Sequence, residues 1–195
     1  MDIDVIEIGP SLRAAPVAPV HARALASLVD HNLAHLHPYL PAVTALAAFD
    51  VAEAYLGRAA ARAQDDDVLE WHIFSDDALC GALRLNHIET DNRKASVAYY
   101  VGADYQGRGI ASSAVRALLR YAFRVLDMNR VELRCVPANL PSVRMAERLG
   151  FTREGVLRQA ELLDGVFMDH AVYGLLRADF VRMENAAAQA AVVPG

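Results

Sequence analysis

The middle of the chain alternates apolar and polar residues in the way that β-strands do. Three such runs, at residues 68–75, 78–87 and 94–102, are joined by short turns rich in Asp, Asn and Thr. Turns of that length and composition favour β-hairpins. The three runs therefore predict an antiparallel meander.

Helical spacing replaces this alternation on the N-terminal side of the meander. Residues 1–19 alternate only weakly and contain three prolines, which predicts one strand and an irregular connection. Apolar residues then recur at helical spacing over 21–32, and a second helix is predicted over 44–63. Between them, residues 32–41 contain two prolines and should form a loop, whose histidines and tyrosine favour a place beside a pocket.

A helix and a parallel strand follow the meander. Residues 110–126 have the apolar stripe of an amphipathic helix, and residues 130–136, with β-branched and aliphatic residues, indicate another strand. A helix that crosses between two neighbouring strands of one sheet makes those strands parallel, so 130–136 should lie parallel to 94–102. A short helix over 143–149, closed by a glycine, comes next.

A closing hairpin, with strands over 151–157 and 165–176, completes the order of elements. The order predicts an α+β fold with a mixed, mostly antiparallel sheet of about seven strands, one parallel pair at its centre and about four flanking helices. We expect a single domain over residues 1–183. The alanine-rich residues 184–195 should form a frayed, flexible C-terminal tail.

Composition and charge narrow the class of protein. The chain has 195 residues and a net charge of −5, which gives no support to direct binding of nucleic acid or of acidic membranes. Cys80 and Cys135 are too few for a disulfide framework and fit a reducing compartment. The N-terminus lacks the order of a signal peptide, and no apolar run approaches the roughly 20 residues that span a bilayer. We therefore expect a soluble, cytoplasmic protein.

Two glycines stand between the strand at 94–102 and the helix at 110–126. Gly107 and Gly109 let the backbone approach a ligand without a Cβ atom in the way. The N–H groups of the first helical turn would point at that ligand, and the helix dipole favours an anion. The junction therefore predicts a pyrophosphate site, with a plain strand-to-helix turn as the alternative. A dinucleotide-binding G-x-G-x-x-G loop fits less well, because four residues precede Gly107 and hairpins surround it.

The glycine loop is part of a longer pattern. Gln106, Gly109 and Ala111 match the Q/R-x-x-G-x-G/A acyl-CoA signature of the GCN5-related N-acetyltransferase (GNAT) superfamily. Residues 131–155 and 32–41 resemble the RimJ/RimL-type ribosomal-protein acetyltransferases of that superfamily, and the resemblance extends over nearly the whole chain. It implies the GNAT fold, in which the central parallel pair splays apart. It also implies an N-acetyltransferase that uses acetyl-CoA as its co-substrate.

The resemblance further implies where acetyl-CoA binds. Backbone N–H groups of residues 106–111 would hold the pyrophosphate, Arg108 would add a positive charge, and the strand at 99–101 would pair with the pantetheine arm. Asn139 and Ser142 match the family's N-x-x-S pair beside the cofactor's arm and thiol. The implied cofactor-binding residues are Tyr99, Tyr100, Val101, Gln106, Gly107, Arg108, Gly109, Ile110, Ala111, Asn139 and Ser142.

These residues also have ordinary structural explanations. Arg108 can equally face solvent, and at least one of Tyr99 and Tyr100 can belong to the core or its rim. Asn139 and Ser142 can form a loop-to-helix cap, and Ser142 is suited to cap the following helix. Both explanations stay open at the level of the sequence.

Acetyl transfer requires a base for the amine, a hydrogen-bond donor for the oxyanion and an acid for the thiolate. The expected oxyanion donor is a backbone N–H near Tyr100 or Val101. Ser142 is the candidate acid, and Tyr173, on a late strand, competes with it.

The base is less evident from the sequence. Related sequences often carry a glutamate early in the central strand, where this chain has Ser96. A serine hydroxyl, whose pKa lies far above 7, is a poor general base. The remaining candidates are Glu132, which opens the parallel strand, and then Glu89, Glu70 and His87.

The expected acceptor is a protein or peptide N-terminal α-amine, in particular that of a ribosomal protein. An α-amine with a pKa of about 8 is already partly neutral at pH 7, whereas a lysine at about 10.4 needs more help. Acetylation of a small-molecule amine is the enzymatic alternative. A non-catalytic acyl-CoA-binding module is the alternative that Ser96 keeps open. Related enzymes are monomers or dimers, so a homodimer is also to be considered.

Three histidines raise the question of a metal site. His31 and His35 have the i, i+4 spacing that can hold zinc on a helix face. No third ligand is evident, and Pro38 ends the helix just after His37. We therefore expect no metal, and we expect these histidines to line an acceptor pocket.

Overall fold

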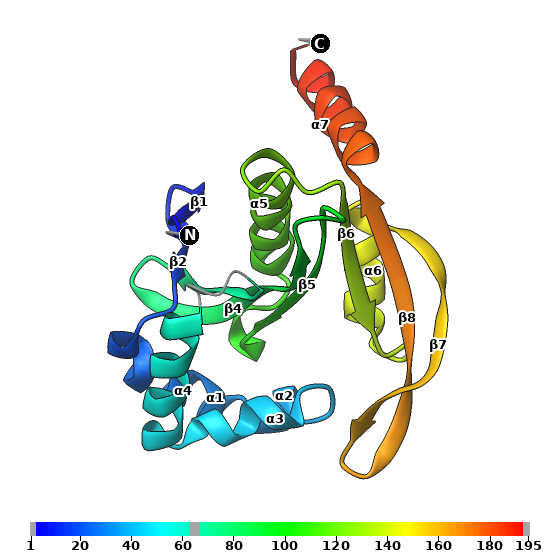
Figure 1. The fold of residues 1–195 in the computed structure, drawn as a ribbon. Helices are drawn as coiled ribbons and strands as arrows, with labels where there is room; N and C mark the ends of the chain where they lie inside the picture. Colours follow the sequence, from blue (N-terminus) through cyan, green and yellow to red (C-terminus); the bar gives the residue numbers. More distant parts are fainter. Residues whose placement is uncertain (1–2, 63–66, 193–195) are drawn as a thin grey trace.

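One mixed sheet of eight strands runs through the molecule in the order β1-β2-β3-β4-β5-β6-β8-β7 (Figure 1). This computed structural model describes residues 3–62 and 67–192. Neighbouring strands pair antiparallel except β5 and β6, which are parallel. The strands are β1 (Ile6–Gly9), β2 (Leu12–Pro16), β3 (Leu69–Ser75), β4 (Ala78–Glu89), β5 (Lys94–Val101), β6 (Arg130–Cys135), β7 (Thr152–Leu163) and β8 (Val166–Leu176).

Helices cover both faces of the sheet. Helices α5 and α6 pack on one face over a core that includes Trp71, and α1 and α4 pack on the other over a core that includes Phe74. Among the described residues, no helix is long and apolar enough to cross a membrane. The α-helices are α1 (Ala22–His31), α2 (Leu33–Leu36), α3 (Pro41–Thr44), α4 (Phe49–Arg62), α5 (Ile110–Arg124), α6 (Leu140–Arg148) and α7 (Arg177–Val192), and short 3₁₀ turns are η1 (Pro19–His21), η2 (Ala45–Ala47) and η3 (Ala103–Tyr105).

The parallel pair β5–β6 opens into a gap. Its pairing runs only from Lys94 opposite Arg130 to Val97 opposite Leu133. Strand β5 continues to Val101 along β4, and β6 continues to Cys135 along β8. The two strands therefore separate at the end from which the chain enters α5, as the GNAT resemblance predicted. We call this opening the β5–β6 gap.

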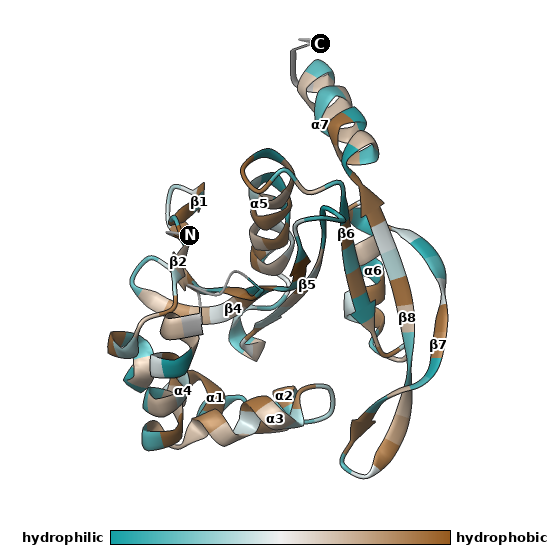
Figure 2. Ribbon diagram, in the orientation of Figure 1, coloured by the Kyte–Doolittle hydropathy of each residue, from teal (hydrophilic) through white to brown (hydrophobic). Residues whose placement is uncertain are grey.

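The closing hairpin is longer than predicted and projects from the body of the molecule (Figure 1). Register shifts between Leu157 and Glu161 let β7 continue to Leu163, beyond the predicted end at residue 157. Its free end carries exposed apolar side chains, which Figure 2 shows as brown segments at the tips of β7 and β8. These side chains include Leu162, Val166 and Phe167.

The N-terminal part differs from the sequence prediction in two ways. Residues 1–19 hold two strands rather than one, because β1 turns back onto β2, which also pairs with β3. The helix predicted over 44–63 is interrupted, since Ala48 has extended backbone with ψ 126° and separates η2 from α4. Its predicted last residue, Ala63, lies outside the described residues. The predicted loop at 32–41 begins with α2, whose Leu36 is buried.

The C-terminal segment also differs from the prediction. Residues 184–192 are the C-terminal part of helix α7, and residues 193–195 lie outside the described part. Glu184 has only 12% of its side chain exposed and forms ion pairs with Arg120 and Arg124 of α5. These contacts stabilise the helix beyond the point where composition alone predicts its end.

Candidate active site

Backbone polar groups of β5 line one side of the β5–β6 gap. The carbonyl of Arg93 accepts from the N–H of Arg130 on the β6 side, while the N–H of Gly102 donates to the carbonyl of Cys80 on the β4 side. Peptide groups of successive strand residues alternate between the two sides. Tyr99 and Val101 therefore turn their N–H and C=O groups toward the gap.

The same alternation corrects the expectation for Tyr100. Its peptide groups face β4, where Tyr100 lies opposite Ala82. Its side chain packs among the residues under α1 and α4, and burial raises the pKa of its phenol well above the usual range. Of the two expected oxyanion donors, Val101 is the one whose N–H faces the gap.

The glycine loop presents an open surface at the start of α5. Gly107 and Gly109 have φ of +71° and +76°, a left-handed conformation that favours glycine, and a Cβ added at either would meet nothing within 4 Å. Gly109 is the N-cap of α5, and no side chain of the described residues caps the first turn. Buried Ile110 anchors the helix behind the loop. The guanidinium of Arg108 lies over the ring of Tyr105, 5.8 Å from its centroid.

Free N–H groups, positive φ and a nearby cation are the features that hold a pyrophosphate. The N–H of Gln106 already donates to the carbonyl of Ala103 at 3.1 Å, so the backbone of residues 107–111 is the part of the loop that fits the predicted pyrophosphate. Gln106 to Gly109 are all on the surface, so a ligand could reach them directly.

Asn139 and Ser142 meet at the first turn of α6, and their roles there differ. Asn139 is the N-cap, because its Oδ1 accepts from the N–H of Ser142 at 3.3 Å. The cap lets α6 begin at Leu140, earlier than the predicted start at residue 143. Ser142 is thus not the capping side chain, and its hydroxyl accepts a hydrogen bond from the phenol of Tyr99 at 2.9 Å.

Tyr99 and Tyr173 are the two phenols near this end of β6. Tyr99 is half-buried, and burial raises the pKa of its phenol although the bond to Ser142 lowers it. Tyr173, on β8 opposite Leu133, is 2% exposed and belongs to the core under α5 and α6. Tyr173 is therefore less accessible to a ligand than Ser142.

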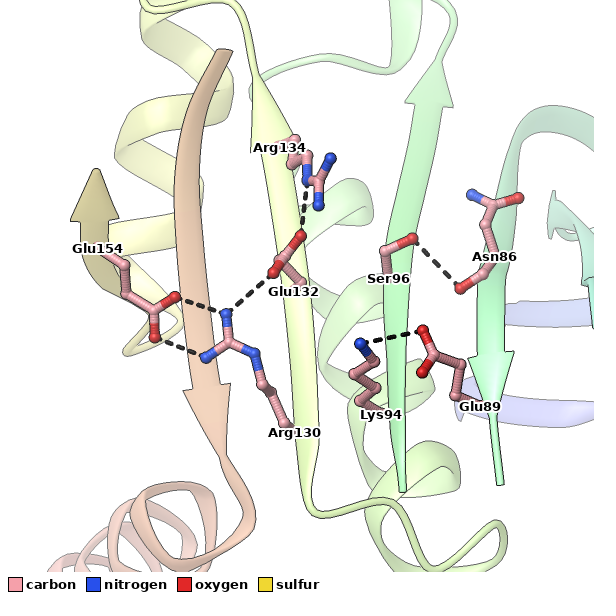
Figure 3. Close-up of polar contacts among 8 residues, drawn as sticks. All are labelled: Asn86, Glu89, Lys94, Ser96, Arg130, Glu132, Arg134 and Glu154. Carbon is pink, nitrogen blue, oxygen red and sulfur yellow. Dashed lines mark hydrogen bonds and ion pairs between the residues drawn. The ribbon is translucent and has the colours of Figure 1, made fainter. Parts of the chain in front are cut away.

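Glu132, the leading base candidate, points to the face of the sheet that lies away from α5 and α6. Two arginines bind it there (Figure 3). Its carboxylate accepts from Arg134 Nε at 2.6 Å and from Arg130 Nη2 at 3.0 Å. Arg130 also binds Glu154. Burial on its own raises the pKa of Glu132, but the hydrogen bonds from both arginines bring it below its ordinary value. A carboxylate so stabilised is a weak base.

The other base candidates are also engaged elsewhere. The hydroxyl of Ser96 donates to the carbonyl of Asn86 at 3.2 Å and so points toward β4 (Figure 3). Glu89 is exposed and pairs with Lys94 at 3.0 Å. The remaining two, Glu70 and His87, lie apart from the gap: Glu70 is buried under α4 in contact with Tyr55 and Arg84, and His87 is exposed at the irregular end of β4.

Comparisons with known proteins identify the family. Residues 12–152 match the model of the acetyltransferase (GNAT) domain. The chain belongs to this family. The resemblance seen in the sequence predicted this family and the splayed parallel pair, and both predictions are confirmed.

Curated relatives of this GNAT chain match over part of their length. It is 36% identical over 101 residues to the ribosomal-protein-serine acetyltransferase of Escherichia coli (strain K12), which is 52% of this chain and 56% of that protein. It is 34% identical over 112 residues to YdaF of Bacillus subtilis (strain 168), covering 57% and 61% of the two chains. The matched segments thus span about three fifths of these relatives or less.

Solved GNAT structures match over nearly the whole chain. One is RimL, a ribosomal L7/L12 α-N-protein acetyltransferase in complex with coenzyme A, at a TM-score of 0.84 and 28% identity over 89% of this chain and 98% of that one. Another is the microcin C7 self-immunity acetyltransferase MccE with acetyl-CoA and AMP, at a TM-score of 0.83 and 25% identity over 87% and 94%.

The histidines His31, His35 and His37 lie in different surroundings. His31 contacts the carbonyl of Ser27 in its own helix at 2.7 Å, and His37 lies 3.3 Å from Asp164 at the hairpin turn. His35 Nε2 lies 3.2 Å from the carbonyl of Val101. Among the described residues, no group of three or more His, Cys, Asp or Glu could hold a metal ion.

Two contacts between the histidine-rich segment and the chain that follows β5 were not predicted from the sequence. His35 Nε2 also lies 3.2 Å from the side-chain nitrogen of Gln106. Asn32, at 8% exposure, accepts from the N–H of Ala103 at 2.7 Å. Both come from the start of the histidine-rich segment that was expected to lie near a pocket. Helices α1 and α2 are thereby joined to the chain between β5 and the glycine loop.

Proposed function

We propose that this GNAT chain is an acetyl-CoA-dependent N-acetyltransferase whose acceptor is a protein or peptide N-terminal α-amine. The observation that carries the proposal is the placement of three features around one opening. The β5–β6 gap exposes the peptide groups of Tyr99 and Val101, the glycine loop follows at the end of β5, and the Ser142 hydroxyl lies beside Tyr99.

Each part of this opening has a role in the proposed reaction. The backbone of residues 107–111 binds the pyrophosphate, and Arg108 adds a positive charge there. The peptide groups of Tyr99 pair with the pantetheine arm as an added strand would, because the carbonyl of Val101 is already in contact with His35. The N–H of Val101 stabilises the oxyanion, and Ser142 protonates the departing thiolate.

Glu132 and Ser96, which lie opposite each other in the β5–β6 pair, are both held by partners, and this favours an acceptor that needs little help with deprotonation. Glu132 is already bound by Arg130 and Arg134, and Ser96 donates to a backbone carbonyl. An α-amine, with a pKa of about 8, is about one tenth neutral at pH 7, whereas a lysine amine is almost wholly protonated. An α-amine can therefore attack the thioester without a strong base nearby.

Relatives support the same acceptor class. The relative from Escherichia coli is named as a ribosomal-protein-serine acetyltransferase, and the RimL structure as an α-N-protein acetyltransferase. A ribosomal-protein N-terminus is accordingly the proposed partner, and a cytoplasmic location follows from that partner. The similarity to MccE, a microcin C7 self-immunity acetyltransferase solved with acetyl-CoA and AMP, favours a second candidate, acetylation of a small-molecule amine.

A panel of acceptors tests the proposal. Purified protein is mixed with acetyl-CoA, and thiol release is followed with a peptide that has a free N-terminal serine or alanine. One matched control is the same peptide with a blocked N-terminus and one internal lysine. A second control is a set of small amines. We expect rapid release with the free N-terminus only. Release with small amines alone would favour the second candidate, and tight binding of acetyl-CoA without amine-dependent release would leave a non-catalytic binding module.

A further inference from the structure

Tyr99 and Ser142 form a hydroxyl pair at the edge of the β5–β6 gap. The phenol of Tyr99 donates to Ser142 Oγ at 2.9 Å. Because Tyr99 is the donor, the hydrogen of the Ser142 hydroxyl is free to point to another acceptor. The peptide groups of Tyr99 itself face the gap, so the pair lies directly beside it.

Both members of the pair are held in place by the fold. Strand β5 fixes Tyr99, whose ring packs against the core under α5 and α6. The cap at Asn139 fixes the first turn of α6 and with it Ser142. The two residues are 43 positions apart in the sequence, and the geometry of their contact is set by the packing of α6 against β6 and β7.

A serine hydroxyl alone is a weak acid for a departing thiolate. Loss of its proton leaves an alkoxide, whose conjugate acid has a pKa far above that of a thiol. A phenol has an ordinary pKa of about 10, much closer to that of a thiol at about 8.5. A phenol with this ordinary pKa is protonated at neutral pH, so the proton of Tyr99 is present when the thiolate forms.

We propose that Tyr99 is a positioning residue that orients the Ser142 hydroxyl and replaces its proton as Ser142 protonates the sulfur of CoA. In this step the carbon–sulfur bond of the tetrahedral adduct breaks and its electron pair goes to sulfur. Sulfur takes the proton of Ser142 Oγ, which takes the proton of Tyr99 Oη, and the phenolate regains a proton from solvent. The inference rests on the proposed acetyl transfer, in which Ser142 is the acid. It adds the hydroxyl of Tyr99 as the group that supplies Ser142 with a proton.

The test removes each hydroxyl singly and together. Tyr99→Phe keeps the ring but deletes Oη, and Ser142→Ala deletes Oγ. We expect each to lower kcat about 10²-fold, the lower end of general-acid effects. We expect the dissociation constant of acetyl-CoA, measured by calorimetry, to stay within about twofold because no packing is lost. The double variant should be no slower than Ser142→Ala, since the two residues act in one step.

A matched control separates this effect from the loss of any buried phenol. Tyr121, on α5, is 7% exposed and stacks edge-on against Trp71, away from the gap. Tyr121→Phe should leave kcat and the affinity for acetyl-CoA unchanged. A kcat within twofold of wild type for Tyr99→Phe, or effects that multiply in the double variant, would overturn the inference while leaving acetyl transfer intact.

A second measurement needs no acceptor and therefore does not depend on the proposed function. The pKa of the CoA thiol bound to the protein is followed by the ultraviolet absorbance of its thiolate. A hydroxyl that donates to the thiolate lowers that pKa. We expect Ser142→Ala and Tyr99→Phe both to raise it, and the double variant to raise it no further. An unchanged thiol pKa in Tyr99→Phe would overturn the relay even if no acceptor has been found.

Discussion

The two faces of the sheet at the β5–β6 gap use their polar groups differently. The gap itself offers peptide groups of Tyr99 and Val101, and the α5 and α6 side adds an uncapped helix start and the Ser142 hydroxyl. On the opposite face, the side chains of Arg130, Glu132 and Arg134 bind one another (Figure 3). One face presents neutral dipoles toward a ligand, and the other pairs its charges internally.

This difference suits a reaction that depends on positioning more than on a strong base. Neutral backbone donors can be open to solvent at little cost, and they stabilise negative charge when it develops. A carboxylate used as a base would have to be left without strong partners, so that its pKa rises toward the working pH. Glu132 shows the reverse arrangement, and its pKa is lowered.

The largest effect is expected at the glycine loop. Gly109 has φ +76°, so Gly109→Val places a β-branched residue in a left-handed conformation that costs about 1–2 kcal/mol. The loop should then relax away from the geometry that directs its N–H groups outward. We expect the dissociation constant of acetyl-CoA to rise at least about tenfold by calorimetry, which corresponds to 1.4 kcal/mol.

Gly57 supplies the control for that substitution. It lies exposed in α4, and a Cβ added there meets nothing within 4 Å. Gly57→Ala should raise the free energy of unfolding by about 0.5–1 kcal/mol and leave acetyl-CoA binding unchanged. If Gly109→Val instead binds acetyl-CoA with unchanged affinity, the pyrophosphate lies away from the glycine loop. The contrast between the two faces of the sheet is then lost.

A smaller effect, on stability rather than turnover, is expected at Glu132. Glu132→Gln keeps the shape but leaves Arg130 and Arg134 without the charge between them. We expect the free energy of unfolding in urea to fall by about 1 kcal/mol, as for a partly exposed ion pair. We expect kcat to change less than threefold. A loss of kcat of about 10²-fold would identify Glu132 as the base.

The pH dependence of that stability effect has a defined sign. The native pKa of Glu132 is lowered, so its contribution is complete above the unfolded value of about 4.3 and is lost as the pH falls through the native value. The difference between native protein and Glu132→Gln should therefore be constant above about pH 5 and shrink below it. A difference that grows with acid would mean that the native pKa is raised.

Much of the fold was predictable because its signals are local. The alternation in β3, β4 and β5, the apolar stripe of α5 and the spacing of Gly107 and Gly109 each lie within one short segment. The parallel pairing of β5 and β6 follows from the crossover helix between them. The extension of α7 was not predictable in this way, since it depends on Glu184 meeting Arg120 about 60 residues away in sequence.

The candidate site was predictable to different degrees on its two faces. The arginines around Glu132 leave a visible signal, because residues 130, 132 and 134 of one strand must share a face, and the charges alternate. The contact of Tyr99 with Ser142 leaves none, because it depends on how α6 packs after a turn. Sequence motifs thus identified both residues but not the bond between them.

The smallest effect is expected where the hairpin turn meets α2. His37 and Asp164 lie 3.3 Å apart, but their side chains are 55% and 56% exposed. Asn tolerates the left-handed conformation of Asp164, so Asp164→Asn removes only the charge. We expect a loss of a few tenths of a kcal/mol, about 1 °C in Tm, which should vanish in 1 M salt. A different result is that the variant keeps its stability but raises the KM for the peptide acceptor more than about threefold. That result would mean that this contact shapes the acceptor site and that recognition extends beyond the β5–β6 gap.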